Sequence, residues 1–233
     1  MHLSQAFNAS KEANFMQATR TTCSPVLGYS HFNDAGKHNK DWATKCIEFN
    51  DTVFNNIEKS QNIKVVILAS TFKGFTQGAP FRALVRQYDD VLRSFSFSEE
   101  QSLQVLSSTI DKLRSSGKKV VIMAPPPSSG RNMSYCVERR MRNLITFNGS
   151  DCSISIAHDK VAYGKVMQLL SRLSEIANVQ VIDLRDNLCS DTKCATMLNG
   201  VPLYSDWGHL SIPGSAEIGK QFKLYDTLIR AAR

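Results

Sequence analysis

The run IKVVILA, from Ile63 to Ala69, is continuous, apolar and rich in β-branched residues. Such a run is typical of a strand that is buried on both faces of a sheet. Two similar runs follow along the chain, KVVIMA at 119–124 and VQVID at 179–183. Segments long enough to form helices separate the three runs, which predicts right-handed βαβ crossovers. We therefore expect an α/β fold with a parallel sheet and helices on both of its faces.

Helical patterns surround these three runs. Ser98 and Gln101 form a capping box at the start of one helix, and Gly117 ends it. Pro213-Gly214 opens a single carboxyl-terminal helix of about eighteen residues. We expect helices at Leu3–Ala13, Asp41–Lys59, 98–117, 166–176 and after Pro213, and Phe15–Ala18 could form a short strand.

The composition is that of one globular domain covering residues 1–233. The chain is 42% hydrophobic and 21% charged, which is enough to bury a sizeable core. No apolar run approaches the roughly 18 residues that a membrane span needs, and Met1–Phe15 lacks the apolar centre of a signal peptide. The net charge of +7 is scattered, with Arg139-Arg140-Met141-Arg142 as its densest group. Because aromatic residues are not interleaved with these charges, we expect no nucleic-acid partner.

The six cysteines indicate disulfides rather than a metal site. There is no C-x-x-C pair and no histidine at zinc-finger spacing, so neither a metal nor another cofactor is expected. Six cysteines allow about 15 pairings, and reduced buried thiols are the alternative. Disulfides would imply an oxidising compartment, although the chain shows no export signal. The pairing favoured by closeness in the chain is Cys23 with Cys46, Cys136 with Cys152, and Cys189 with Cys194.

A candidate catalytic pair lies in the stretch YSDWGHLSIPG at 204–214. Asp206 precedes His209 by three residues, on a turn just before the last helix. This spacing lets the carboxylate accept the imidazole Nδ1–H and leaves Nε2 free to act as a base. The alternative is a pair that only caps a turn. Because the stretch follows the last predicted strand and returns to the carboxyl edge of the sheet, we favour the catalytic interpretation.

This stretch resembles the last motif of SGNH hydrolases, in particular the SGNH domain at the carboxyl end of acyltransferase-3 type O-acetyltransferases. The resemblance rests on LYSDWGHLSIPG preceded by Cys189 and Cys194, and it extends over nearly the whole chain. Further matching segments are TCSP at 22–25, CIEFN at 46–50, VVILAS at 65–70 and the APPP strand end at 124–127. It implies a flavodoxin-like three-layer α/β/α fold. It also implies that Asp206 orients His209, that His209 is the general base, and that a serine is the nucleophile.

The chain departs from the family pattern at its beginning. Family members start this domain with a strand that ends in G-D-S and carries the nucleophilic serine, whereas Met1-His2-Leu3 resembles the residues just after that motif. Ser70-Thr71-Phe72 also stands where the family has an asparagine block. In the flavodoxin-like order 2-1-3-4-5, loss of the first strand leaves two sheet edges open. We therefore expect residues 1–233 to be a fragment of a longer membrane-anchored protein, nearly inactive without the upstream serine.

The resemblance implies acyl transfer to hydroxyls of an envelope polysaccharide, such as a lipopolysaccharide O-antigen, through a serine ester. The implied partners are the polysaccharide, an acyl donor and a membrane acyltransferase domain. The implied location is the periplasmic or extracellular face, tethered to the inner membrane. Gly28 and Ser70 are candidate oxyanion groups. Two alternatives stay open: a secreted carbohydrate acetyl esterase with Ser30 as its nucleophile, and a catalytically dead module that binds glycan.

Overall fold

The computed structural model describes residues 4, 14–146 and 151–231. The chain divides into two compact units. The first, here called the sheet unit, contains residues 18–124 and 165–182. The second, here called the carboxyl-terminal unit, contains residues 1–17, 125–164 and 183–231. The expected helix at Leu3–Ala13 lies outside the described residues except for Ser4.

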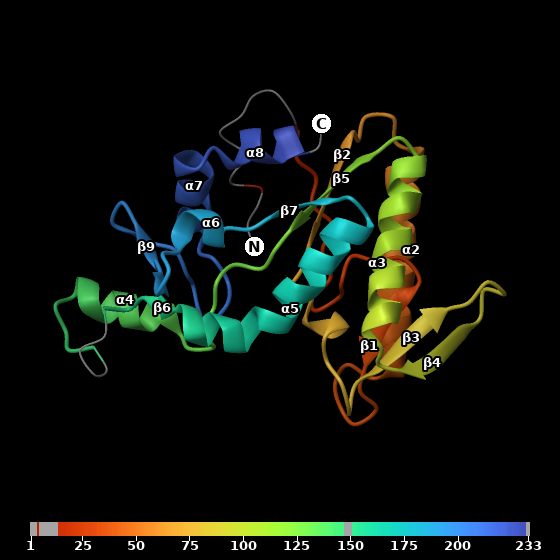
Figure 1. Cartoon of the computed structure of the whole chain (residues 1–233), viewed down its shortest axis with the longest axis horizontal. Coiled ribbons are helices and arrows are strands. Elements are labelled where there is room, and N and C mark those ends of the chain that lie inside the picture. The colour runs from red at the N-terminus through yellow and green to blue at the C-terminus, as the bar shows by residue number, and fades with distance from the viewer. Residues whose placement is uncertain (1–3, 5–13, 147–150, 232–233) are drawn as a thin grey trace. The chain divides into compact units, whose positions relative to one another are not determined.

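The predicted parallel sheet is confirmed in the sheet unit (Figure 1). It consists of β2 (Val65–Ala69), β5 (Lys119–Met123) and β7 (Gln180–Ile182), in the order β2-β5-β7. Val66 lies opposite Val120, and Ile122 lies opposite Val181. The three apolar runs therefore form one sheet, and the chain has the expected α/β fold.

Burial of the first strand differs from the expectation. Only Val66 and Leu68 of β2 are buried, while the alternate positions are partly exposed. β5, in contrast, is buried from Val120 to Met123. The difference follows from position, because among the described strands β5 lies between two partners and β2 pairs with only one.

A second, antiparallel sheet was not anticipated. It contains β1 (Tyr29–Phe32), β3 (Arg82–Arg86) and β4 (Leu92–Ser96), with β3 in the middle. Ser30 lies opposite Leu84, and Leu84 opposite Ser94. Phe32 and Leu84 pack with Ala43 and Ile47 of the helix α2, which covers this sheet.

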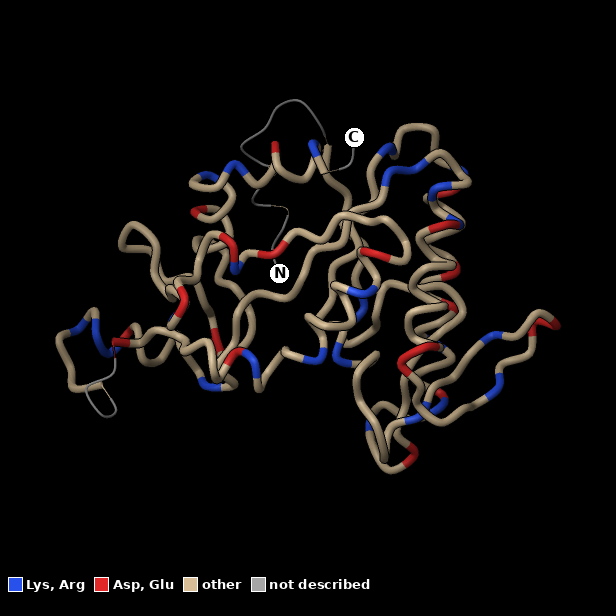
Figure 2. Tube along the Cα trace, viewed as in Figure 1, with Lys and Arg blue, Asp and Glu red and all other residues tan. Residues whose placement is uncertain are grey.

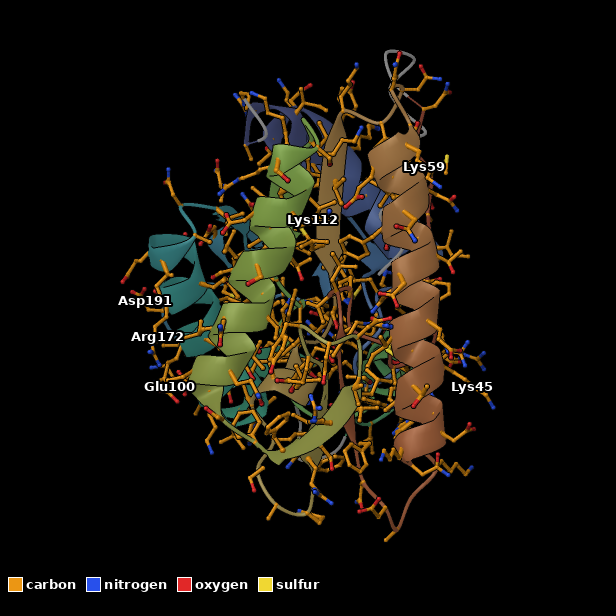
Figure 3. All side chains as sticks on the ribbon, turned by 90° about the vertical axis from the view of Figure 1, so that its right-hand side faces the viewer. Lys45, Lys59, Glu100, Lys112, Arg172 and Asp191 are labelled. Atoms are coloured by element: carbon orange, nitrogen blue, oxygen red, sulfur yellow. A yellow bond between two sulfur atoms is a disulfide. The ribbon has the colours of Figure 1, made fainter. Side chains whose placement is uncertain are left out.

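The main helices of the sheet unit begin and end close to the predicted residues. Helix α2 (Lys40–Lys59) begins where the Asn39 side chain accepts the Trp42 N–H, and α3 (Glu99–Ser115) begins at Ser98, which accepts the Gln101 N–H. Gly117, with φ of +78°, follows the end of α3. In Figure 3, Lys59 marks the last residue of α2, and Lys45 lies in the second turn of that helix. Lys112 of α3 lies 3.5 Å from Glu58 of α2.

Helix α5 (Ile156–Ile176) starts ten residues, or nearly three turns, before the predicted stripe at 166–176, and its residues are divided between the two units. Its part in the sheet unit buries Leu169, Leu170 and Leu173 completely. Arg172 forms an ion pair with Glu99 at the start of α3.

The carboxyl-terminal unit consists of short elements. They are α4 (Met133–Met141), β6 (Ile154–Ser155), α6 (Arg185–Leu188), β8 (Lys193–Cys194), β9 (Met197–Leu198), β10 (Val201–Pro202), α7 (Ile212–Gln221) and α8 (Leu224–Ala231). The strand pairs β6 with β8 and β9 with β10 are antiparallel.

Two sequence expectations at the ends of the chain were wrong. The carboxyl-terminal helix is two helices, because Lys223 takes a left-handed conformation with φ of +46° and ends the run at Phe222. Phe15–Ala18 is irregular instead of a strand, and the side chain of Met16 there is 81% exposed.

Three disulfides join cysteines that are neighbours in the sequence order: Cys23–Cys46, Cys136–Cys152 and Cys189–Cys194. The first ties the segment before β1 to α2. The second ties α4 to the segment before β6, and the third closes the short loop between α6 and β8. Charged residues are spread over most elements of both units, as Figure 2 shows. No helix of the described residues is long and apolar enough to span a membrane.

Candidate active site

Asp206 and His209 are in direct contact on one tight turn of the carboxyl-terminal unit. Asp206 Oδ2 lies 2.7 Å from His209 Nδ1, and Asp206 Oδ1 accepts the backbone N–H groups of Gly208 and His209, each at 2.8 Å. The Ser205 N–H donates to the His209 carbonyl at 2.9 Å and closes the turn. An ionised carboxylate can only accept, so the proton of this contact lies on Nδ1 and the lone pair on Nε2.

The charge of Asp206 is stabilised by the same turn. Burial alone would raise the pKa of this carboxyl, but hydrogen bonds from Gly208 and His209, together with attraction to the imidazole, hold the pKa below its ordinary value. The carboxylate is thus ionised at neutral pH. The side chain of His209 is 63% exposed, which leaves the ring open to a reactant. The pair can therefore take up and return a proton at Nε2.

Trp207 lies beside the histidine and was missed as a site residue, although it belongs to the quoted stretch. The Trp207 and His209 rings meet edge to face, with their centroids 6.0 Å apart, and Trp207 is 52% exposed. An exposed indole next to the base offers an apolar surface to a bound group. A large exposed aromatic residue between Asp and His was the signal that could have indicated this role.

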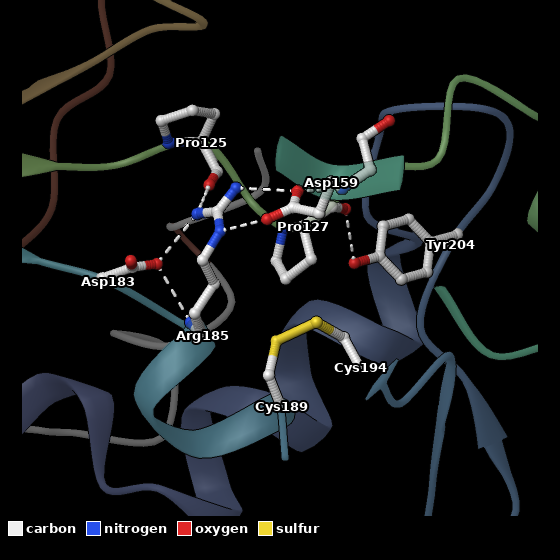
Figure 4. Close-up of polar contacts among 9 residues, drawn as sticks. Pro125, Pro127, Asp159, Asp183, Arg185, Cys189, Cys194 and Tyr204 are labelled. Carbon is white, nitrogen blue, oxygen red and sulfur yellow. Dashed lines mark hydrogen bonds and ion pairs between the residues drawn. A yellow bond between two sulfur atoms is a disulfide. The ribbon is translucent and has the colours of Figure 1, made fainter. Parts of the chain in front are cut away.

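A buried ionic network belongs to the same unit (Figure 4). Arg185 lies between two carboxylates, with Nε 2.6 Å from Asp159 Oδ2 and Nη1 2.9 Å from Asp183 Oδ1. Burial alone would lower the pKa of Arg185, but hydrogen bonding and attraction to these carboxylates outweigh it and raise the pKa above its ordinary value. No local pattern in the sequence indicates this network, because Asp159 lies 26 positions before Arg185.

The remaining candidate residues belong to the sheet unit. Gly28, with φ of +62°, precedes β1, and its carbonyl accepts the Arg86 N–H at 2.7 Å. Ser30 is buried in the middle of β1, where its hydroxyl donates to the His31 carbonyl at 3.2 Å. Ser70 directly follows β2, and its hydroxyl accepts the Phe72 N–H at 3.3 Å. Each of the three thus has a contact with the backbone of its own unit.

No metal site is evident in the part of the chain that the structure describes. Among those residues, no group of three or more His, Cys, Asp or Glu side chains could hold an ion. All six cysteines are in disulfides, so none offers a thiolate ligand. The chemistry that the described residues support is proton transfer by the Asp206–His209 pair.

Comparison with known proteins identifies the class of domain. The family model of the SGNH domain fused to AT3 domains matches residues 1–224, and the chain belongs to this family. The structure is similar to that of the periplasmic domain of a lipopolysaccharide acetyltransferase from Salmonella ser. Paratyphi A, with a TM-score of 0.62. The match covers 97% of this chain and 77% of that one at 18% identity, so it supports the fold alone. A search of curated proteins found no match to the chain.

Proposed function

We propose that the chain is the acyl-transfer domain of an O-acyltransferase that moves an acetyl group onto hydroxyls of a cell-envelope polysaccharide. The observation that carries the proposal is the 2.7 Å contact between Asp206 and His209 in a chain of the SGNH family. The fusion of this family to AT3 domains supports a transferase. We propose acetyl as the group transferred, the group named in the description of the structurally similar domain.

The proposed reaction has two half-reactions. A serine hydroxyl attacks the acyl carbon of the donor while its proton passes to His209 Nε2, and the leaving group then takes that proton. Asp206 keeps the imidazole oriented and stabilises its positive charge. In the second half, a sugar hydroxyl gives its proton to Nε2 and attacks the serine ester, and His209 returns the proton to the serine. Water in place of the sugar would give hydrolysis.

The nucleophile in this proposal is a serine encoded upstream of residue 1, in a longer membrane-anchored polypeptide. Support comes from β2, which pairs only with β5 among the described strands. An edge strand offers unpaired N–H and C=O groups to a further strand. In the 2-1-3-4-5 order the first strand lies beside the third, the position that β2 would occupy. We propose that a strand ending in the serine pairs there, and that both units belong to one SGNH domain.

We also propose that the domain works at the periplasmic face of the inner membrane, with an acyl donor, the polysaccharide and a membrane acyltransferase domain as partners. The three disulfides support an oxidising compartment. The similar domain is described as periplasmic, which agrees with this location.

The test is the initial rate of polysaccharide O-acetylation by the whole protein that the gene encodes. His209→Ala is expected to lower the rate by about 10³-fold or more, because the base is lost, and Asp206→Asn by a similar factor, because the imidazole loses its orientation. His158→Ala is the matched control, since that side chain is exposed in the same unit.

Three outcomes would contradict parts of the proposal. An unchanged rate in His209→Ala would mean that the pair has no catalytic part. Release of acetate without O-acetylated glycan would favour the esterase alternative. Glycan binding without turnover, unaffected by either substitution, would favour a binding module.

A further inference from the structure

We infer that Arg185 and Asp159 are positioning residues for His209 and that they act through Ser128. The inference builds on the proposed role of His209, but it concerns the geometry of the turn at 204–209 and can be tested without activity. The connection runs from the buried ion pair to the Pro125–Ser128 loop, and from that loop to the turn.

The first step is the ion pair itself. Arg185 contacts Asp159 through two nitrogens, Nε at 2.6 Å from Oδ2 and Nη2 at 3.0 Å from Oδ1. The two side chains are only 14% and 7% exposed. A bidentate contact of this kind fixes both the distance between the guanidinium and the carboxylate and their relative orientation. The ion pair is therefore held in one geometry, in which it can form hydrogen bonds with neighbouring backbone groups.

The ion pair forms hydrogen bonds with the loop that follows β5. Arg185 Nη1 donates to the Pro125 carbonyl at 2.9 Å, and Asp159 Oδ1 accepts the Ser128 N–H at 2.9 Å. Three consecutive prolines, 125–127, have no N–H groups. Ser128 therefore carries the first backbone donor after β5 beyond Ala124, and the buried carboxylate takes it. The loop is held at its two ends by the two members of one ion pair.

The third step connects the loop to the turn that carries the histidine. The Ser128 hydroxyl donates to the Trp207 carbonyl at 2.9 Å, and the Tyr204 hydroxyl donates to the Pro127 carbonyl at 2.8 Å. Ser128 and Tyr204 are each 2% exposed. Burial raises the pKa of Tyr204 above its ordinary value, so its hydroxyl remains a donor. Because Trp207 lies between Asp206 and His209, the Ser128 bond acts directly on the peptide that sets their spacing.

A purely structural role of the ion pair makes a different prediction. If Arg185 and Asp159 only stabilised the carboxyl-terminal unit, their loss would weaken the protection of backbone amides from hydrogen exchange evenly across that unit. A positioning role requires a local effect on the 204–209 turn. Hydrogen exchange of the Gly208 and His209 amides separates the two roles, because both amides donate to Asp206 in the intact turn.

The decisive variant is Ser128→Ala, which removes the hydroxyl and leaves the ion pair and the backbone N–H in place. We expect exchange at the Gly208 and His209 amides to rise about tenfold, the effect of one buried hydrogen bond. Exchange in β5 and α5 should stay unchanged. Ser129→Ala is the matched control, because that hydroxyl contacts Met133 Sδ and not the turn. Unchanged exchange at both amides, or an equal rise throughout the unit, would overturn the inference.

Arg185→Lys extends the test to the ion pair. The lysine keeps the positive charge but cannot form the bidentate contact with Asp159, so the Gly208 and His209 amides should exchange faster. Arg172→Lys, in the exposed ion pair with Glu99, is the control and should not affect them. In the whole protein, Ser128→Ala should lower kcat about tenfold with KM unchanged. If O-acetylation does not occur at all, the exchange result still decides the inference, so its failure and that of the proposed function are distinguishable.

Discussion

At the scale of single residues, the contact between Asp206 and His209 depends on their spacing. An aspartate three residues before a histidine can accept the backbone N–H groups at the second and third following positions, and here it also reaches the ring. All of these bonds are local in sequence, which is why the sequence alone predicts the pair. The Arg185–Asp159 contact joins residues 26 positions apart, and no local pattern marks it.

A pH titration checks the electrostatics of this turn. The pKa of Asp206 is held below its ordinary value of 3.8, despite burial, by hydrogen bonds from Gly208 and His209. A lowered folded-state pKa means that the stabilisation is present above the unfolded value and is lost as pH falls through the folded value. The carbon resonance of the Asp206 carboxyl should therefore titrate with a midpoint below 3.8. A midpoint at or above that value would show that the hydrogen bonds do not favour the carboxylate.

At the scale of elements, the sequence predicts those helices and strands that are determined by patterns among neighbouring residues. The strands β2, β5 and β7 are continuous apolar runs, and α2 and α3 have polar caps at their first turns. The antiparallel sheet was not predicted, because β3 and β4 join through residues 87–91, which contain neither glycine nor asparagine. The break between α7 and α8 was missed for a related reason. It lies at Lys223, where neither glycine nor proline signals a left-handed residue.

Asn50 provides a test of how α2 holds the segment before β1. Its side-chain amide is buried and donates to the carbonyls of Ser24 and Val26, at 2.7 and 2.9 Å. Asn50→Ala leaves two buried carbonyls without this donor and should lower the free energy of unfolding by about 1–3 kcal/mol. Urea denaturation measures the change. Asn55→Ala, at an exposed position of the same helix, should have almost no effect. Equal effects of the two substitutions would contradict this role of Asn50.

At the scale of the whole molecule, the alternation of strands and helices was enough to predict an α/β fold with a parallel sheet. The match of the SGNH family model to residues 1–224 agrees with the resemblance found in the 204–214 stretch. The division into two compact units could not be predicted, because it depends on contacts between segments far apart in the chain. Residues 183–231 belong to the same unit as residues 125–164. The last predicted strand, 179–183, separates these two segments in the sequence but does not indicate that they pack together.

The proposed mechanism depends on the side of β2 that pairs with no other strand among the described residues. A dyad without a nucleophile can move a proton but cannot form an acyl-enzyme. In our proposal the serine comes from a strand that pairs with β2, so the complete protein must contain a serine that becomes acylated and that requires His209 for its reactivity.

The most direct measurement is a search for that acyl-enzyme in the whole protein that the gene encodes. The protein is mixed with p-nitrophenyl acetate, quenched in acid and mapped by mass spectrometry. We predict one acetylated serine upstream of residue 1, formed at least about 10³-fold more slowly in His209→Ala and at the normal rate in His158→Ala. Acetylation of Ser30 would instead support the esterase alternative. Turnover of the ester with no acetylated serine, or acetylation that does not depend on His209, would contradict the account.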